Sequence, residues 1–179
     1  IEYKIAIEEV SRVCGSIGLS MAAHNSLCTG HILQFGSEEQ KKTYLTKLTE
    51  GTWTGTMCLT ESHCGTDLSQ LKTKAIENED GSFSISGTKI FISSGDHDLT
   101  QNKVHIVLAR TPDLPDGMKG ISLFIVPKYL PDENGDAGEY NNVSVGSLEH
   151  KLGIHGSSTC VMNFDNAKGF MIGKKGKGV

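Results

Sequence analysis

The chain has 179 residues, of which 37% are hydrophobic and 21% charged, so it can bury one sizeable core, or one domain with part of another. Its net charge of -4 comes with no continuous run of Lys and Arg, which argues against wrapping nucleic acid. No stretch approaches the roughly 18 apolar residues of a membrane span, and no charged-then-apolar leader opens the chain, so we expect a piece of a soluble protein.

The cysteines indicate the compartment. They are odd in number, widely spread and never arranged as Cys-x-x-Cys, so neither a disulfide scaffold nor a zinc ribbon is expected. A reducing, cytoplasmic environment is therefore predicted. The five are Cys14, Cys28, Cys58, Cys64 and Cys160.

Residues 1–51 carry a helical pattern. Apolar residues recur at spacings of three and four from Ile5 to Met21, which predicts one helix whose middle is rich in small residues. Small residues permit a close helix crossing or a direct ligand contact, and we favour the crossing. Ser37, followed by Gln40, predicts a capping box for a second helix that stops before Gly51.

After Gly51 the pattern changes to strands. Segments 72–76, 82–86 and 89–93, separated by turns at 80–81 and 86–88, predict an antiparallel meander. No long helix interrupts the strands, so parallel crossovers are excluded and a small antiparallel barrel or sandwich is expected. The acidic segment 131–140 is predicted to be an exposed loop. Further strands are predicted at 104–109, 121–126, 143–145 and 160–164.

Residues 57–67 form the densest group of polar side chains. The stretch begins as a strand and turns into a polar loop containing glycine, so several backbone N–H groups lack an obvious sheet partner. Such a loop can clasp a planar polar ring or an anion. The alternative is a hairpin corner in which Thr60, Ser62, Thr66 and Asp67 bond to neighbouring backbone, and the spacing leaves both open.

This loop resembles a signature of the acyl-CoA dehydrogenase family, Thr-Glu-x-x-x-Gly-Ser-Asp, which is matched here by Leu59–Asp67. A second flavin segment of the family is similar to Gly87–Gly95, and a third pattern is similar to Lys151–Gly153 with Ser157–Thr159. Phe35–Lys41 resembles the family's helix start. In detail, residues 95–99 and 151–157 look most like the subgroup that includes 3-methylthiopropanoyl-CoA dehydrogenases.

The resemblance implies an α+β fold, in which a helical segment is followed by an antiparallel, barrel-like middle domain. Residues 1–51 are expected to end an N-terminal helical domain, 52–172 to form the β-domain, and 173–179 to begin a linker. It also implies an FAD enzyme that forms a trans double bond between the α and β carbons of an acyl-CoA and passes electrons to an electron-transfer flavoprotein. The full-length protein is expected to be a homo-oligomer. The alternatives are an acyl-CoA oxidase, or a non-enzymatic module that retains the fold.

The resemblance also assigns roles to individual residues. Met57, Leu59 and Thr60 are expected to line the flavin ring. Gly65 and Thr66 are expected to contact the diphosphate side, with Thr66 also near CoA. Phe91, where the family often has Trp, Ile92 and Ser93 are expected to cover the ring, with Ser93 near N5. No catalytic residue is assigned, because the family's base is a Glu of a C-terminal helical domain, expected beyond Val179.

Other chemical groups are interpreted as structural. Glu61 and Asp67 are predicted to cap backbone N–H groups rather than act as acid and base. His63 and Cys64 lack a third ligand at zinc spacing, so no metal is expected. His24 and His31 are interpreted as polar caps within the helical layer. The segment 173–178 lacks the features of a phosphate-binding loop and is predicted to be a solvated turn. Lys119 remains a hypothesis for substrate contact.

Overall fold

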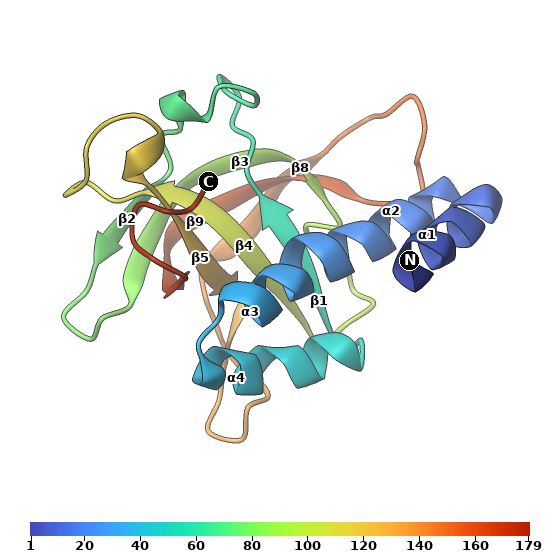
Figure 1. Cartoon of the computed structure of the whole chain (residues 1–179), viewed down its shortest axis with the longest axis horizontal. Helices are drawn as coiled ribbons and strands as arrows, with labels where there is room; N and C mark the ends of the chain where they lie inside the picture. The colour runs from blue at the N-terminus through green and yellow to red at the C-terminus, as the bar shows by residue number, and fades with distance from the viewer.

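The computed structural model describes all 179 residues and places a helical layer against a curved sheet (Figure 1). Helices precede the strands, so the predicted α+β class is confirmed. The helical elements are α1 (Glu2–Val13), α2 (Gly15–Ala22), the π-helical segment η1 (Ala23–Thr29), α3 (Gly30–Phe35) and α4 (Glu38–Thr49), with 3-10 turns η2 (Leu68–Gln70) and η3 (Met118–Gly120). The strands are β1 (Trp53–Cys58), β2 (Lys74–Glu77), β3 (Phe83–Ser93), β4 (Asn102–Arg110), β5 (Ile121–Pro127), β6 (Tyr129–Pro131), β7 (Ala137–Tyr140), β8 (Val143–Leu148) and β9 (Thr159–Ile172).

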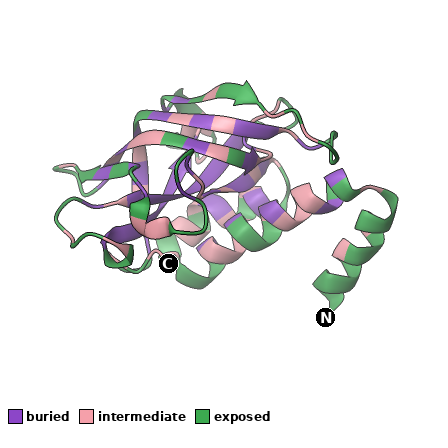
Figure 2. Cartoon of the chain, turned by 90° about the horizontal axis from the view of Figure 1, so that it is seen from above, coloured by how far each residue is buried: buried purple, intermediate pink, exposed green.

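The helical region breaks at Cys14, so the single helix predicted from Ile5 to Met21 is wrong. Cys14 has φ -149° and ψ 103°, an extended conformation that ends α1 and begins α2. None of the residues of α1 is buried, and Figure 2 shows this helix projecting from the rest of the molecule. None of the helices is both long and apolar enough to cross a membrane.

The small residues of α2 face two neighbours. A Cβ on Gly18 would lie 2.0 Å from Ser11 Oγ on α1, so the predicted close helix crossing is confirmed. On the same helix, Ser16 Oγ accepts from the N–H of Gly156 (3.1 Å), and Ser20 Oγ donates to Ser157 Oγ (3.0 Å). The short side chains therefore admit both α1 and the loop before β9.

The predicted capping box begins α4. Gln40 N–H donates to Ser37 Oγ over 3.2 Å, and Ser37 N–H donates to Gln40 Oε1 over 3.0 Å. Gly51 follows the helix at φ +73°, as predicted. Gln40 Nε2 also donates to the carbonyl of Met171 on β9 (2.8 Å), so the cap fastens the helix to the sheet.

The sheet has the order β1-β4-β2-β3-β9-β5, with β8 on β9 and a further β4–β5 pairing. Its pairs, including β4–β5, are antiparallel except for two: β4 pairs in parallel with β1, from Trp53↔Asn102 to Cys58↔Val107, and with β2. The exclusion of parallel pairing was therefore wrong, because β2 and β3 make the crossover that was expected to need a helix. The β2–β4 contact is one pair, Lys74↔Arg110, so the sheet is barrel-like rather than a fully closed barrel.

Other strand predictions are partly corrected. The strands predicted at 104–109, 121–126, 143–145 and 160–164 form, although β9 is much longer than expected. The turn predicted at 86–88 is absent, because Gly87 makes an irregularity inside β3, where a Cβ would lie 2.5 Å from Thr73 Oγ1. Segment 131–140 is part of the β6–β7 hairpin rather than only a loop.

The strand β4 separates two apolar clusters and is buried on both faces. Val104, Ile106 and Leu108 join one cluster with Trp53, Leu48 and other residues of the helical layer. Val107 and Ala109 join the second, which contains the sheet residues Phe83 and Phe124. The helices therefore cover one side of β1 and β4, while the remaining strands close over the other.

The predicted turn at 173–178 lies along β5. Gly176 N–H donates to Ser122 Oγ (2.9 Å), and Gly178 N–H donates to the carbonyl of Ile121 (3.0 Å). The ammonium of Lys175 pairs with Glu77 (2.9 Å) and with an aspartate, Asp113 (2.8 Å). The polar groups of segment 173–178 therefore bond to the sheet and not only to solvent.

Candidate functional site

The two turns singled out in the sequence lie side by side. One follows β1 and runs from Leu59 to Asp67, and the other ends β3 at Phe91–Ser93. The N–H of Ile90 donates to the carbonyl of Thr60 (2.9 Å), and Thr56 Oγ1 donates to the carbonyl of Ser93 (2.7 Å). The end of β1 is thus joined to the end of β3, although these two strands are not neighbours in the sheet.

The residues expected to bind a flavin differ in their exposure. Met57, Leu59, Thr60 and Ser93 are half-buried, whereas Gly65, Thr66 and Phe91 are exposed. Ile92 is only 2% exposed and belongs to the sheet-side cluster with Cys160 and Met162. Its side chain points into the core because neighbouring residues of a strand alternate between faces, so only its backbone is left to meet a ligand.

The first turn leaves backbone donors free. Glu61 and Cys64 close it with two hydrogen bonds, from Glu61 N–H to the Cys64 carbonyl (2.9 Å) and back (3.1 Å). The N–H groups of Thr60, Gly65 and Thr66 donate to no other protein group. Unpaired N–H groups in a short loop can receive the acceptor atoms of a planar ring or a diphosphate. The loop is a hairpin corner, but of the four side chains expected to bond neighbouring backbone only that of Asp67 does so, to Ser69 N–H. The free N–H groups fit the interpretation of a donor-rich loop.

At the end of β3 two residues other than glycine adopt a left-handed backbone conformation. Phe91 has φ +61° and Ser94 has φ +53°, in the left-handed region that costs most residues energy. Phe91 is nevertheless 58% exposed, so little burial of its own repays this cost. An exposed aromatic side chain on a strained backbone, close to a turn with free N–H groups, is the arrangement expected of a ligand-binding surface.

Glu61 and Asp67 cap backbone groups, as predicted. Glu61 accepts from the N–H groups of Lys72 (2.8 Å) and Thr73 (3.0 Å), from Thr73 Oγ1 (2.6 Å) and from Lys89 Nζ (3.0 Å). Burial acts to raise the pKa of Glu61, but the Thr73 hydrogen bond and the Lys89 charge outweigh it and lower that pKa. Asp67 accepts from Ser69 N–H (3.1 Å), and the hydrogen bonds from Ser69 lower its pKa.

Sequence reasoning missed Lys89. This lysine is 0% exposed, and burial acts to lower its pKa while the charge of Glu61 acts to raise it. The available signal was the single charged residue of the stretch Phe83 to Ser93, where it shares a face with buried positions. Its partner could not be found in this way, because Glu61 lies in a loop 28 positions earlier.

The structure adds a third potential metal ligand that the sequence spacing did not suggest. One ligand atom each from Glu61, His63 and Cys64 lies within 4.8 Å of the others. The carboxylate of Glu61, however, already accepts four hydrogen bonds, one of them from the ammonium of Lys89. A metal ion would have to compete with that positive charge, so the cluster is better explained as a structural network.

The interpretation of His24 as a cap is confirmed. Its Nδ1 accepts from Gly55 N–H on β1 (3.0 Å), and its Nε2 then donates to the carbonyl of Leu48 (3.0 Å). Burial lowers the pKa of His24, which matches this neutral form. His31 does not fit the same interpretation, because its buried Nδ1 has no partner.

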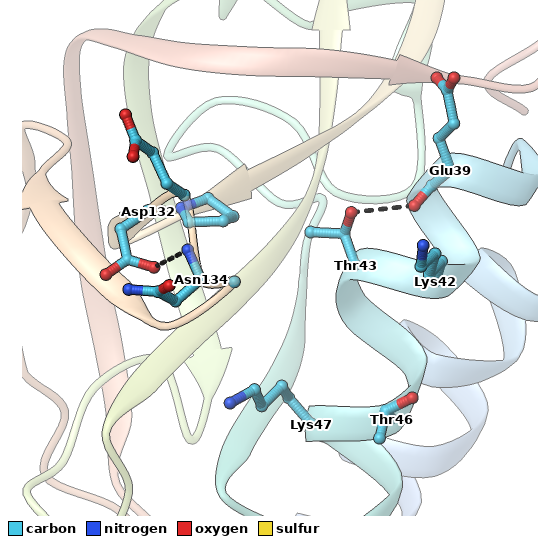
Figure 3. A pocket seen from close by; sticks show the side chains of 10 residues that line it. Glu39, Lys42, Thr43, Thr46, Lys47, Asp132 and Asn134 are labelled. Atoms are coloured by element: carbon cyan, nitrogen blue, oxygen red, sulfur yellow. Dashed lines mark hydrogen bonds between the residues drawn. The ribbon is translucent and has the colours of Figure 1, made fainter.

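Two polar pockets are lined by residues other than those expected to bind a flavin. A cleft of about 400 Å³ opens between α2 and the loop after β3, where Ser94 donates to Ser20 (3.0 Å) and His97 bonds Thr54 (3.1 Å). A groove of about 630 Å³ lies between α4 and the β6–β7 turn (Figure 3). Lys47, which lines it, pairs with Asp136. The groups lining the cleft largely satisfy one another. Lys119 lies exposed on η3 and lines neither pocket.

Comparisons with known proteins agree on one family. The profile of the acyl-CoA dehydrogenase middle domain matches residues 56–167, and that of the N-terminal domain matches residues 1–52. The 3-methylmercaptopropionyl-CoA dehydrogenase of Ruegeria pomeroyi is 52% identical over 144 residues, which cover 80% of this chain and 24% of the relative.

Solved structures share the fold. The butyryl-CoA dehydrogenase of Megasphaera elsdenii superimposes with a TM-score of 0.82 at 36% identity, over 97% of this chain and 42% of that chain. An acyl-CoA dehydrogenase of Bacillus anthracis, in complex with FAD, gives a TM-score of 0.77 at 31% identity, over 96% and 27%. The chain therefore spans less than half the length of these relatives. With more than half of its residues matched by one profile, it belongs to the acyl-CoA dehydrogenase family.

Proposed function

We propose that the protein to which this chain belongs is an FAD-dependent enzyme that removes hydrogens from the α and β carbons of an acyl-CoA thioester. The observation that carries this proposal is the pair of adjacent turns, one with free N–H groups at Thr60, Gly65 and Thr66, and the other with an exposed Phe91. Acceptor atoms of a flavin and its diphosphate suit the first turn, and a flat apolar face suits the second.

We propose the individual roles that the family resemblance implies. Met57, Leu59 and Thr60 line the ring, and the free N–H of Thr60 meets an acceptor at its pyrimidine edge. Gly65 and Thr66 hold the diphosphate side, with Thr66 also near CoA. When bound, FAD supplies the acceptor for the hydride that leaves the β carbon. Phe91, Ser93 and the backbone of Ile92 lie against the ring, with Ser93 at N5.

The base that removes the α proton lies outside this chain in the proposal. The carboxylates nearest the turns, Glu61 and Asp67, are engaged by hydrogen bonds and lack the freedom to take a proton from a substrate. We therefore expect no turnover and weak FAD retention from the 179-residue chain alone. In this proposal residues 1–51 complete a helical domain, 52–172 form the flavin-binding β-domain and 173–179 begin a linker, in an oligomeric, cytoplasmic enzyme.

The full-length protein tests the function. Anaerobic addition of an acyl-CoA should bleach the oxidised flavin band, and chromatography should find the trans-enoyl-CoA product. Reoxidation by an electron-transfer flavoprotein rather than by air would support the proposed electron acceptor, whereas fast reoxidation in air would indicate an oxidase. A full-length protein that binds neither FAD nor acyl-CoA would overturn the proposal in favour of a non-enzymatic module.

A further inference from the structure

The ion pair between Lys89 and Glu61 is unusually deep for a sheet this small. The Lys89 side chain is 0% exposed and that of Glu61 is 4% exposed, with Nζ and Oε1 3.0 Å apart. Burying two charges costs several kcal/mol per ion before their attraction repays it, and apolar replacements of such pairs are often as stable. Stability alone therefore gives a weak reason for a charged pair at this position.

The contacts of Lys89 explain the pair better. Its Nζ donates to the carbonyl of Leu59 over 2.9 Å, while the next residue of β3, Ile90, donates its N–H to the carbonyl of Thr60 over 2.9 Å. Two successive carbonyls of the first turn are thus held by β3, one by a side chain and one by the backbone.

Because of peptide geometry, the hydrogen bond from Lys89 to the Leu59 carbonyl also sets the direction of the Thr60 N–H. The carbonyl of Leu59 and the N–H of Thr60 belong to one planar trans peptide, in which they point in opposite directions. Lys89 holds the carbonyl end, so the N–H of Thr60 is directed away from the ammonium. That N–H donates to no protein group.

Glu61 fixes the position of the ammonium. Its carboxylate is itself anchored by Lys72 N–H, Thr73 N–H and Thr73 Oγ1, at 2.8, 3.0 and 2.6 Å. A lysine chain held at its charged end by an anchored carboxylate loses the rotamer freedom that would let it release the Leu59 carbonyl. The three segments 59–61, 72–73 and 89–90 are therefore coupled through these contacts.

We propose that Lys89, held by Glu61, is a positioning residue that aims the Thr60 N–H at the bound flavin. This inference rests on the flavin site proposed above. It predicts that the loss of the ammonium lets the Leu59–Thr60 peptide rotate, so that the FAD affinity falls further than it does when a lysine buried elsewhere in the sheet is replaced.

The test compares Lys89→Met with Lys103→Met in the full-length protein. Lys103 on β4 is a matched control, since it is also buried and its Nζ donates to a backbone carbonyl, that of Thr100 (2.9 Å). FAD titration should show about a tenfold weaker Kd for Lys89→Met, as expected for one well-placed hydrogen bond, and less than about a threefold change for Lys103→Met. The ¹⁵N-threonine spectrum should show the Thr60 amide shifted only by the Lys89 substitution.

Each outcome decides the inference. Equal losses of FAD affinity in the two variants, or an unmoved Thr60 amide in Lys89→Met, would overturn it. If Lys89→Met does not fold, Glu61→Gln replaces it, because the amide oxygen still accepts a bond while the ammonium loses its counter-charge. A wild-type protein that binds no FAD would instead contradict the proposed function and, with it, the role toward a flavin. The Thr60 amide shift would then show only whether Lys89 orients the Leu59–Thr60 peptide.

Discussion

The hydroxyl of Thr56 on β1 donates a hydrogen bond to the backbone carbonyl of Ser93 at the end of β3, over 2.7 Å. Thr56 is 1% exposed, and its strand pairs with β4 rather than with β3. This side chain therefore ties the turn that ends at Ser93 to a strand that it does not otherwise pair with.

Removing this hydroxyl should destabilise the chain. In Thr56→Val the shape is kept but the Ser93 carbonyl loses a buried donor, which we expect to cost about 1–3 kcal/mol in the free energy of unfolding. Thr88→Val is the control, because the Thr88 hydroxyl is exposed and bonds Asn163 at the surface (2.9 Å). Urea unfolding measures both, and a Thr56 variant no less stable than the Thr88 variant would contradict the role given to this bond.

Acid should destabilise the fold through His105. This residue is fully buried, and burial lowers its pKa to about 3. The folded state therefore binds fewer protons than the unfolded state, whose histidine pKa is about 6.5, so stability is complete above that pH and falls as the pH drops toward 3. At about 1.4 kcal/mol per pKa unit, the loss amounts to several kcal/mol.

Replacing His105 isolates this effect. In His105→Leu the fall in unfolding free energy between pH 6.5 and pH 4 should shrink, though not vanish, because burial also lowers the pKa of His24 and His97. The prediction fails if the His105→Leu profile retains the full wild-type slope.

The sequence allowed prediction where structure is decided locally. The Ser37–Gln40 capping box and the strand alternation each depend on residues a few positions apart, and both are present. The break at Cys14 depends on one residue's dihedral angles, which the apolar period does not report. The parallel β1–β4 pairing and the Lys89–Glu61 contact join segments that are far apart in the sequence. They depend on the tertiary fold, so local patterns could not predict them.

Gly55 should tolerate no side chain. A Cβ there would lie 2.3 Å from Cys28 Sγ, because β1 packs directly on η1. Gly55→Ala should therefore cost about 1–3 kcal/mol of unfolding free energy through overpacking. Gly15→Ala serves as the control, since nothing lies within 4 Å of its Cβ and a helical position should gain up to about 1 kcal/mol. Thermal unfolding of the two alanine variants should rank them on opposite sides of the wild type.

Phe91 should show a conflict between stability and ligand binding. Its φ of +61° suits glycine, and its ring is 58% exposed, so Phe91→Gly removes strain while sacrificing little packing. We expect the variant without ligand to be as stable as the wild type, or more stable by up to about 1 kcal/mol. In the full-length protein FAD should bind at least about tenfold more weakly, because the ring proposed to cover the flavin is gone.

A second residue with a left-handed backbone conformation serves to separate the relief of strain from the loss of FAD binding. Asn142 has φ +52° and is exposed, but it lies before β8, away from both turns. Asn142→Gly should relieve less strain, because Asn tolerates the left-handed region better than Phe does, and it should leave the FAD affinity unchanged, as measured by flavin fluorescence titration. If Phe91→Gly binds FAD as tightly as Asn142→Gly does, the exposed ring has no part in holding the cofactor. If Phe91→Gly is instead strongly destabilised without ligand, the ring is a packing element, and its exposure would have to be explained in another way.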